Sequence, residues 1–279
     1  MGVLGLIAGG GGLPVEVVRA CERAGRPVFV IRLKGLADPA LDAFAGADVG
    51  LAEFGRCLSA LRSAGCDRVA FAGKVRRPDF ASLKPDLKAL RHLPAIAAAA
   101  TKGDDALLRA LLGAFETEGF TVESVQAIAM GLVLAAGPLG KVAPRAEHQR
   151  DIAEALRAAR EIGRRDLGQA AVARSGVVLA VEGQAGTDAL LAEVAAMRPG
   201  PHDAPEYRCG VLAKAPKPIQ DRRVDLPTIG LATVEHAAEA GLAGIVGEAG
   251  GLLVVGGAEV REAADRLGLF VYGAPEPQP

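Results

Sequence analysis

The chain has 279 residues, of which 50% are hydrophobic and only 4% aromatic, and its formal net charge is −1 at pH 7. This length suits one large or two ordinary domains, and a core rich in Ala, Val and Leu is typical of helices packed on sheets. The near-neutral charge argues against a nucleic-acid partner and favours a small anionic ligand bound by local basic clusters.

Cysteine usage and hydropathy suggest a cellular compartment. The four cysteines (Cys21, Cys57, Cys66 and Cys209) form no CxxC pair, which favours reduced thiols in a cytoplasmic protein. No apolar run approaches the ~20 residues needed to span a bilayer. The apolar run 2–12 lacks a positively charged start and a cleavage site, so it predicts a strand rather than a signal peptide.

The first 32 residues predict a strand, a glycine turn, a helix and a second strand. Val3–Ala8 is the expected buried strand, residues 15–24 have helical spacing, and residues 27–32 are again strand-like. Glycines in such a turn let the backbone approach an anion at a helix N-terminus. The candidate ligand residues of this turn are Gly10, Gly11, Gly12 and Leu13.

The end of the second strand argues against a dinucleotide cofactor. Arg32 and Lys34 stand where a dinucleotide fold usually carries an acid. A lone glycine turn is also a weak signal for such a fold. We therefore expect a nucleotide or sugar phosphate at this turn, with an NADP-type ligand as an alternative.

A third strand is expected at residues 68–73, after a helix at residues 53–64. Lys74 and Arg77 follow that strand, at the sheet edge where open α/β sheets bind ligands. They are candidates to contact a phosphate. The alternative is that they are exposed cations in an ordinary loop.

Alanine-rich helices are expected at residues 85–100, followed by the run Lys102–Arg109. Asp104 or Asp105 can cap the next helix, and one of them can also bind a sugar hydroxyl or a metal; we take Asp104 as the candidate substrate contact. A strand at residues 120–125 completes this half of the chain.

We expect an α/β fold with two domains. Residues 1–136 form a Rossmann-like N-terminal domain with a parallel sheet, and residues 137–140 form a Gly-Pro linker. Residues 141–279 form a C-terminal mixed α/β domain that carries the catalytic residues.

The C-terminal domain begins with a long helix at residues 147–167. Strands at residues 169–174 and 176–182 flank Ser175–Gly176, a hairpin signal. A glycine turn then precedes a helix at residues 189–197, again a place where anions bind. Gly186, Thr187 and Asp188 are its candidate substrate residues, with an N-cap as the alternative role for Thr187 or Asp188.

The rest of this domain predicts alternating strands and helices. A second hairpin is expected between residues 244–249 and 252–255, around Gly250–Gly251. The other expected elements are strands at 207–212 and 269–272 and helices at 233–240 and 259–267.

Residues 214–230 form a proline-stiffened stretch that gathers both signs of charge. Prolines disfavour helix, so a loop is expected, and loops with both charge signs are good candidates for sites. The alternative is a surface loop whose charges pair with one another. Its polar residues are Lys214, Lys217, Gln220, Asp221, Arg222, Arg223 and Asp225.

Two carboxylates of this stretch differ in their neighbours. Asp221 lies beside Arg222 and Arg223 and is readily explained as their partner, whereas Asp225 has no adjacent cation. The charge of Asp225 therefore suits a metal ion or an attacking water.

Histidine spacing argues against zinc. The four histidines show no HxxxH or HExxH spacing, and no GxSxG nucleophile motif occurs. Any metal would be held mainly by carboxylates, which favours Mg²⁺ or Mn²⁺. Asp225 and Asp188 are the candidate ligands.

These motifs together resemble those of the UDP-2,3-diacylglucosamine pyrophosphatases of the LpxI type, enzymes of lipid A biosynthesis. The resemblance spans nearly the whole chain. Its motifs are the Gly-rich opening ending in Leu-Pro, Gly73-Lys74 with Arg77-Pro78, the Gly-Asp-Asp-x-Leu-Leu-Arg run, Val181-Glu182 followed by Gly186-Thr-Asp188, and the stretch 214–230.

The resemblance implies a reaction and a place. A pyrophosphatase of this type hydrolyses UDP-2,3-diacylglucosamine to UMP and 2,3-diacylglucosamine 1-phosphate (lipid X) with a divalent ion. The lipid-bearing substrate implies a cytoplasmic protein in transient contact with the cytoplasmic face of the inner membrane. A homodimer is an open alternative, as are a nucleotide-sugar-binding regulatory module and an NADP-type reductase.

The candidate residues can supply that chemistry between the two halves of the chain. Lys74, Lys214, Lys217 and Arg222 or Arg223 would neutralise the diphosphate, with Gln220 as a further substrate contact. Asp225, with Asp221 or Asp188, would hold the metal or align water; Asp225, Asp221 and Lys217 are the expected catalytic residues.

Overall fold

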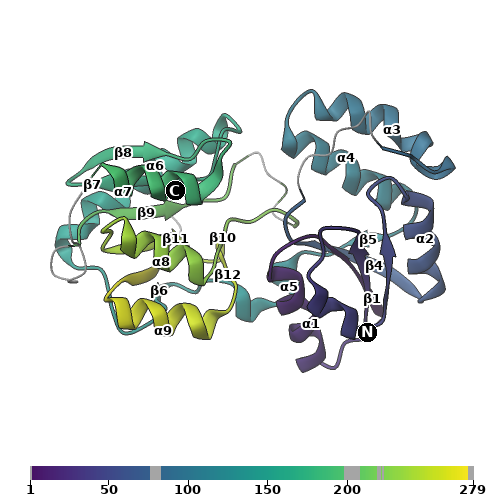
Figure 1. The fold of residues 1–279 in the computed structure, drawn as a ribbon, viewed down its shortest axis with the longest axis horizontal. Coiled ribbons are helices and arrows are strands. Elements are labelled where there is room, and N and C mark those ends of the chain that lie inside the picture. Colours follow the sequence, from purple (N-terminus) through teal and green to yellow (C-terminus); the bar gives the residue numbers. More distant parts are fainter. Residues whose placement is uncertain (1, 76–82, 198–207, 219–220, 222, 276–279) are drawn as a thin grey trace. The chain divides into compact units, whose positions relative to one another are not determined.

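The computed structural model describes residues 2–75, 83–197, 208–218, 221 and 223–275. The chain divides into two compact units (Figure 1). Unit 1 comprises Met1–Met130 and Asp221–Val224, and unit 2 comprises Gly131–Gln220 and Asp225–Pro279. Each unit has its own sheet and core and is described by itself.

Unit 1 contains a parallel sheet with the strand order β3-β2-β1-β4-β5. The strands are β1 (Val3–Ala8), β2 (Val28–Leu33), β3 (Gly46–Val49), β4 (Cys66–Ala72) and β5 (Thr121–Val122). The helices are α1 (Leu13–Arg23), α2 (Phe54–Ser63), α3 (Leu87–Ala100), α4 (Asp104–Thr117), α5 (Val125–Ile128) and the 3-10 helix η1 (Pro39–Ala43). The predicted Rossmann-like parallel sheet is confirmed.

Alternating side chains divide the sheet of unit 1 between two layers of helices, because successive residues of a strand point to opposite faces. Ile7, Ile31 and Phe71 belong to one core cluster with residues of α2 and α4, such as Leu61 and Phe115. Helix α1 contacts β1, β2 and β4 without contributing to that cluster, and it packs beside α5 (Figure 1). The sheet is therefore covered on both faces, as parallel sheets require.

Unit 2 contains a mixed sheet with the order β6-β13-β11-β9-β7-β8. Strands β9, β11 and β13 run parallel to one another, whereas β6, β7 and β8 pair antiparallel. The strands of unit 2 are β6 (Gly137–Pro138), β7 (Ala170–Arg174), β8 (Val177–Val181), β9 (Val211–Lys214), β10 (Thr228–Ile229), β11 (Gly244–Glu248), β12 (Leu253–Val254) and β13 (Phe270–Ala274). The predicted mixed α/β domain is confirmed.

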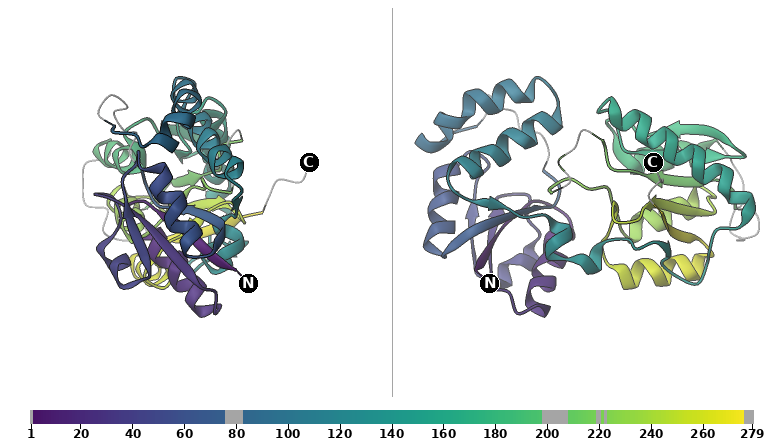
Figure 2. Two further views of the ribbon diagram at one scale, coloured as in Figure 1. Left: turned by 90° about the vertical axis from the view of Figure 1, so that its right-hand side faces the viewer. Right: turned by 180° about the vertical axis from the view of Figure 1, so that it is seen from behind.

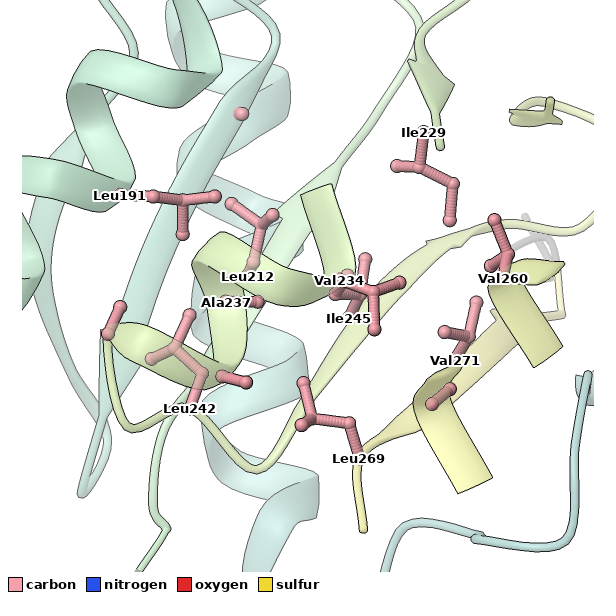
Figure 3. Close-up of a cluster of buried hydrophobic side chains, with 14 of the residues drawn as sticks. Leu191, Leu212, Ile229, Val234, Ala237, Leu242, Ile245, Val260, Leu269 and Val271 are labelled. Carbon is pink, nitrogen blue, oxygen red and sulfur yellow. The ribbon is translucent and has the colours of Figure 1, made fainter. Parts of the chain in front are cut away.

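Two helical layers also cover the sheet of unit 2. The helices are α6 (Gln149–Arg164), α7 (Gly186–Ala196), α8 (Leu231–Glu239) and α9 (Gly257–Leu267), with the 3-10 helices η3 (Met130–Leu132) and η4 (Ala146–His148). Helix α6 packs its alanines against Val246 and Phe270 on one face. Helices α7, α8 and α9 pack on the other face, around Leu212, Ile245 and Val271 (Figure 3; a second and third view of the ribbon are in Figure 2).

The first predicted hairpin is confirmed. Strands β7 and β8 pair antiparallel through Ser175 and Gly176, whose φ angles are 52° and 74°. Two central residues with positive φ define the turn that matches the twist of a tight hairpin.

The second predicted hairpin is wrong. Strand β12 pairs parallel with β10 instead of turning back onto β11. Strand β11 already has β9 on one edge and β13 on the other, so no edge is left for β12. The turn at Gly250, where φ is +78°, instead leads the chain out of the sheet.

The residues expected to form a linker are part of unit 2. Gly137–Pro138 forms β6 and pairs with Tyr272 and Gly273 of β13, while the division between units falls after Met130. The predicted strand 120–125 is also shorter, because Ser124 caps α5 by accepting a hydrogen bond from Ala127 N.

Glu118, at the end of α4, gives unit 1 a pH-dependent contact. Lys88 Nζ and Arg62 Nη2 approach its carboxylate at 2.9 and 3.0 Å, and these hydrogen bonds lower the pKa of Glu118 to about 2. Its side chain is 8% exposed. Because the folded pKa is below the unfolded value, the stabilisation is present above about pH 4.5 and is lost as the pH falls towards 2.

We expect Glu118→Gln to lower the free energy of unfolding at pH 7 by about 1–2 kcal/mol, a value reduced for the solvent around both cations. The difference from the unmodified chain should shrink as the pH falls from 5 to about 2. Urea unfolding across this range measures it, with Glu235→Gln, at an exposed position of α8, as control. A pH-independent difference would contradict the linkage.

Candidate functional site

The sheet of unit 1 places the predicted glycine turn at a topological switch point. From β1 the chain proceeds to β2 and β3 on one side and later returns to β4 on the other side of β1. The loops that follow β1 and β4 therefore leave the same edge of the sheet side by side. In open α/β folds this is where ligands bind.

Backbone contacts hold these two loops together. Gly10 N donates to Lys74 O and Lys74 N donates to Gly10 O, both at 2.8 Å. A Cβ atom on Gly9 would lie 2.7 Å from Lys74 O, and one on Gly73, where φ is +93°, would lie 2.7 Å from Gly10 O. Only glycine fits both positions, so the close approach of the loops explains these residues.

The geometry leaves polar groups of both loops at the sheet edge. Helix α1 begins at Leu13, and its N-cap Gly12 has no side chain to satisfy the first N–H groups, a common arrangement at anion sites. The Lys74 side chain is exposed beside this turn. The structure thus places the turn that holds Gly10, Gly11, Gly12 and Leu13 beside Lys74.

The cations at the end of β2 have protein partners. Arg32 Nε contacts Asp48 at 2.7 Å, and its Nη1 donates to the carbonyl oxygens of Leu41 and Phe44. Lys34 Nζ lies 3.2 Å from Glu53. These two residues therefore have a structural explanation and need no nucleotide.

A buried lysine organises the second candidate site, in unit 2. Lys214, the last residue of β9, is 5% exposed and donates to Thr187 Oγ1 at 2.9 Å and to Thr228 O at 3.1 Å. Thr187 in turn donates to Glu182 Oε1 at 2.6 Å. We call Lys214, Thr187 and Glu182 the lysine–threonine–glutamate cluster.

Glu182 is fixed from both sides. Its side chain is buried, and Gln169 N donates to its second oxygen at 2.7 Å. Since an ionised carboxylate accepts and cannot donate, the Thr187 hydroxyl must give its single proton to Glu182 and use a lone pair for Lys214. The two hydrogen bonds of the cluster therefore have a fixed direction, in which Lys214 donates to Thr187 and Thr187 donates to Glu182.

Among the described residues of the stretch 214–230, three more take part in ion pairs. Lys217 Nζ lies 2.7 Å from Asp166, which has a positive φ of 56° just after α6. Asp221 accepts from Arg223 N, Nε and Nη2, and Arg223 also reaches Glu116 at 2.8 Å. The hydrogen bonds from Arg223 lower the pKa of Asp221. The expected pairing of Asp221 with Arg223 is confirmed.

The two proposed metal ligands have different surroundings. Asp188 lies in the first turn of α7, is 71% exposed, and its Oδ1 is 3.3 Å from His236 Nδ1. Asp225 is half-buried and directly precedes buried Leu226 and Pro227. In the described part of the chain, no three His, Cys, Asp or Glu side chains lie close enough to hold an ion by themselves.

Some predicted site residues cannot be placed. Arg77, Gln220 and Arg222 lie outside the described residues, and the same holds for the side chain of Asp104. Gly186, with φ +84°, begins α7 three residues before the predicted helix start, so Thr187 and Asp188 lie in its first turn and the N-cap is Ala185.

Sequence reasoning placed Glu182 in a motif without giving it a role in the site, and it missed Asp166. Glu182 ends the predicted strand 176–182 and directly precedes the glycine turn, so its position was a usable signal. Asp166 offered no comparable signal, because its contact with Lys217 spans 51 residues of sequence.

A glycine turn at a switch point and a polar cluster at the edge of a second sheet define an α/β protein equipped to bind a phosphorylated ligand. The family model described as LpxI N-terminal domain matches residues 3–132, and that described as LpxI C-terminal domain matches residues 135–272. The chain belongs to the LpxI family.

A named relative agrees with the family match. A protein of Caulobacter vibrioides (strain ATCC 19089 / CIP 103742 / CB 15), the UDP-2,3-diacylglucosamine pyrophosphatase LpxI, is 58% identical over 275 residues, covering 99% of this chain and 98% of the relative. A solved structure of CobK precorrin-6A reductase aligns with a TM-score of 0.34 at 13% identity, covering 100% of this chain and 89% of the other. That likeness is too low to bear on function.

The lysine–threonine–glutamate cluster predicts a difference between two substitutions of Thr187. Thr187→Val removes the hydroxyl between two buried charged groups and should lower the free energy of unfolding by about 1–3 kcal/mol. Thr187→Ser keeps the hydroxyl and should recover most of that loss. Urea unfolding at pH 7 compares them; equal losses for the two variants would show that the hydroxyl does not bridge Lys214 and Glu182.

Proposed function

We propose that this chain is a pyrophosphatase that hydrolyses UDP-2,3-diacylglucosamine to UMP and 2,3-diacylglucosamine 1-phosphate (lipid X) in lipid A biosynthesis. The observation that carries the proposal is 58% identity, over 99% of the chain, to a relative named for that pyrophosphatase activity. The matches to both family domains support it further.

The first task of such an enzyme is to neutralise a diphosphate. In unit 1, the uncapped N-terminus of α1 and the exposed Lys74 ammonium are suited to phosphate oxygens. In unit 2, Lys214 is the corresponding cation, and its Thr187 and Thr228 contacts fix the ammonium in one position. A fixed donor costs no reorganisation as charge develops on the leaving oxygen.

The second task is to direct water at phosphorus. The reaction forms a phosphorus–oxygen bond to water and breaks one bond of the P–O–P bridge, so a proton must leave the attacking water. Asp225 is our proposed acceptor, because a half-buried carboxylate beside an apolar Leu-Pro segment is held at one end. Asp221 and Lys217, in ion pairs with Arg223 and Asp166, are proposed to support the loop that carries it.

A divalent ion, Mg²⁺ or Mn²⁺, is part of the proposal, with Asp225 and Asp188 as its ligands. Mg²⁺ is commonly bound through one or two carboxylates together with substrate phosphates and waters. Two aspartates without a third protein ligand are compatible with that mode. When bound, the ion would neutralise the diphosphate and orient water.

We further propose that the protein works in the cytoplasm and visits the cytoplasmic face of the inner membrane, where a diacylated substrate resides. No described helix of the chain has both the length and the hydropathy to cross a bilayer. A homodimer is retained as a proposal to be tested by sedimentation.

Hydrolysis of UDP-2,3-diacylglucosamine in ¹⁸O-labelled water tests the activity and the metal together. We expect UMP release with Mg²⁺ or Mn²⁺, its loss in EDTA and its return when the ion is added back. The product that carries ¹⁸O identifies the phosphorus attacked. Substrate binding without UMP release would favour a regulatory module, and full turnover in EDTA would remove the metal from the mechanism.

Asp225→Asn tests the proposed acid. Turnover should fall by roughly 100-fold or more, the scale for losing a catalytic acid–base or electrostatic group. Substrate affinity and melting temperature should largely persist, because the cations remain. Single-turnover rates, with Glu235→Asn as a control on the same unit, measure this; a rate within a few-fold of the unmodified chain would exclude Asp225.

A further inference from the structure

Helix α3 in unit 1 presents an unusually apolar outer surface. Leu87 is 87% exposed and Leu90 is 49% exposed, and Pro94, Ala97 and Ala98 continue the exposed row towards the end of the helix. Within the helix only Ala100 is buried. Leucines on a solvated helix face are common singly, but a row with few polar residues marks an interaction surface.

The charged residues that are described as exposed on and beside this face are all cations. Lys88 and Arg91 lie on α3, and Lys84 and Lys102 are exposed just before and after it. Helix α3 contains no Asp or Glu within its bounds, and its N-cap Asp86 is engaged by the backbone N–H groups of Ala89, Gly55 and Arg56. Apolar residues flanked by cations are the composition of helices that lie on anionic membrane surfaces.

Helix α6 shows how the same chain builds an ordinary solvated helix. Its outer face is lined by ion pairs, including Arg157–Glu154, Arg164–Glu161 and Arg165–Glu161. On α3, Lys88 pairs with Glu118, but Arg91 has no ion pair within the part of the chain that the structure describes. The outer surface of α6 therefore carries paired charges of both signs, whereas the outer surface of α3 is mainly apolar and its charges are cations.

We propose that the outer face of α3, formed by Leu87, Leu90, Arg91 and Pro94 with the flanking Lys84 and Lys102, docks the protein on an anionic phospholipid bilayer. The leucines enter the boundary between headgroups and acyl chains, and the cations contact lipid phosphates. The inference rests on the proposed function only for the reason that the protein would dock, since a diacylated substrate lies in such a bilayer.

Charge complementarity selects this occupant over a second copy of the chain. A self-complementary dimer face would set the cations of one copy against the same cations of the other, because a twofold interface uses one patch twice. Like charges so placed are unfavourable, whereas an anionic bilayer matches every exposed cation of the patch.

Vesicle co-sedimentation of the full chain tests the proposal. The unmodified protein should bind vesicles of phosphatidylcholine mixed with phosphatidylglycerol more tightly than phosphatidylcholine alone, and less tightly as salt is raised. Arg91→Gln should weaken binding about fivefold, as expected for one cation at the surface. Leu87→Gln with Leu90→Gln should weaken it about tenfold or more, given the apolar area involved.

Two controls keep these results interpretable. Leu167→Gln changes a leucine that is 56% exposed in unit 2 and should bind vesicles as the unmodified protein does. Melting temperatures confirm that the variants fold. Absence of vesicle binding by the unmodified protein, or unchanged binding by the Leu87/Leu90 variant, overturns the proposal.

Two further measurements separate the alternatives. Self-association that only the Leu87/Leu90 variant abolishes, with vesicle binding intact, would assign the face to a dimer. A raised KM for substrate dispersed in detergent, again with vesicle binding intact, would assign it to the acyl chains. Vesicle binding that is lost in the variant while no preparation releases UMP would sustain the docking surface and reject the proposed function.

Discussion

Burial of the Lys214 ammonium is the constraint on which the candidate site of unit 2 depends. Removing a charge from water costs several kcal/mol unless hydrogen bonds and an opposite charge compensate. Here the compensation comes from Thr187, the Thr228 carbonyl and, through Thr187, Glu182. These residues lie just after β8, at the end of β9, at the start of α7 and in strand β10, so one charge connects four elements of unit 2.

In unit 1, backbone hydrogen bonds rather than side chains hold the candidate site together. At its candidate ligand site, the two loops are joined by the paired hydrogen bonds between Gly10 and Lys74, which need glycine at positions 9 and 73 because no Cβ fits between the loops. The result leaves N–H groups and an exposed cation at the surface rather than a buried network. A backbone edge suits close approach by a phosphate, whereas a side-chain network suits exact placement of one charge.

The sequence carried enough information for the fold and for part of the candidate site. Glycine turns, strand runs and helical periods predicted both sheets and the β7–β8 hairpin, because these signals act over a few residues. The β11–β12 hairpin failed because strand pairing depends on which edges other strands already occupy, and β9 and β13 occupy those of β11. The role of Glu182 was missed for a similar reason: its importance comes from Thr187 and Gln169 together.

Charge partners in the stretch 214–230 show why residue order alone is a poor guide to a site. Asp221 pairs with Arg223 two residues away, but Lys217 pairs with Asp166 across 51 residues, and Arg223 reaches Glu116 across 107. A ligand phosphate that recruits Lys217 or Arg223 must therefore compete with a carboxylate already in contact. That competition makes the exposed Lys74 the stronger candidate for an anion contact within unit 1, and Lys214, which neutral oxygens help to orient, the stronger candidate within unit 2.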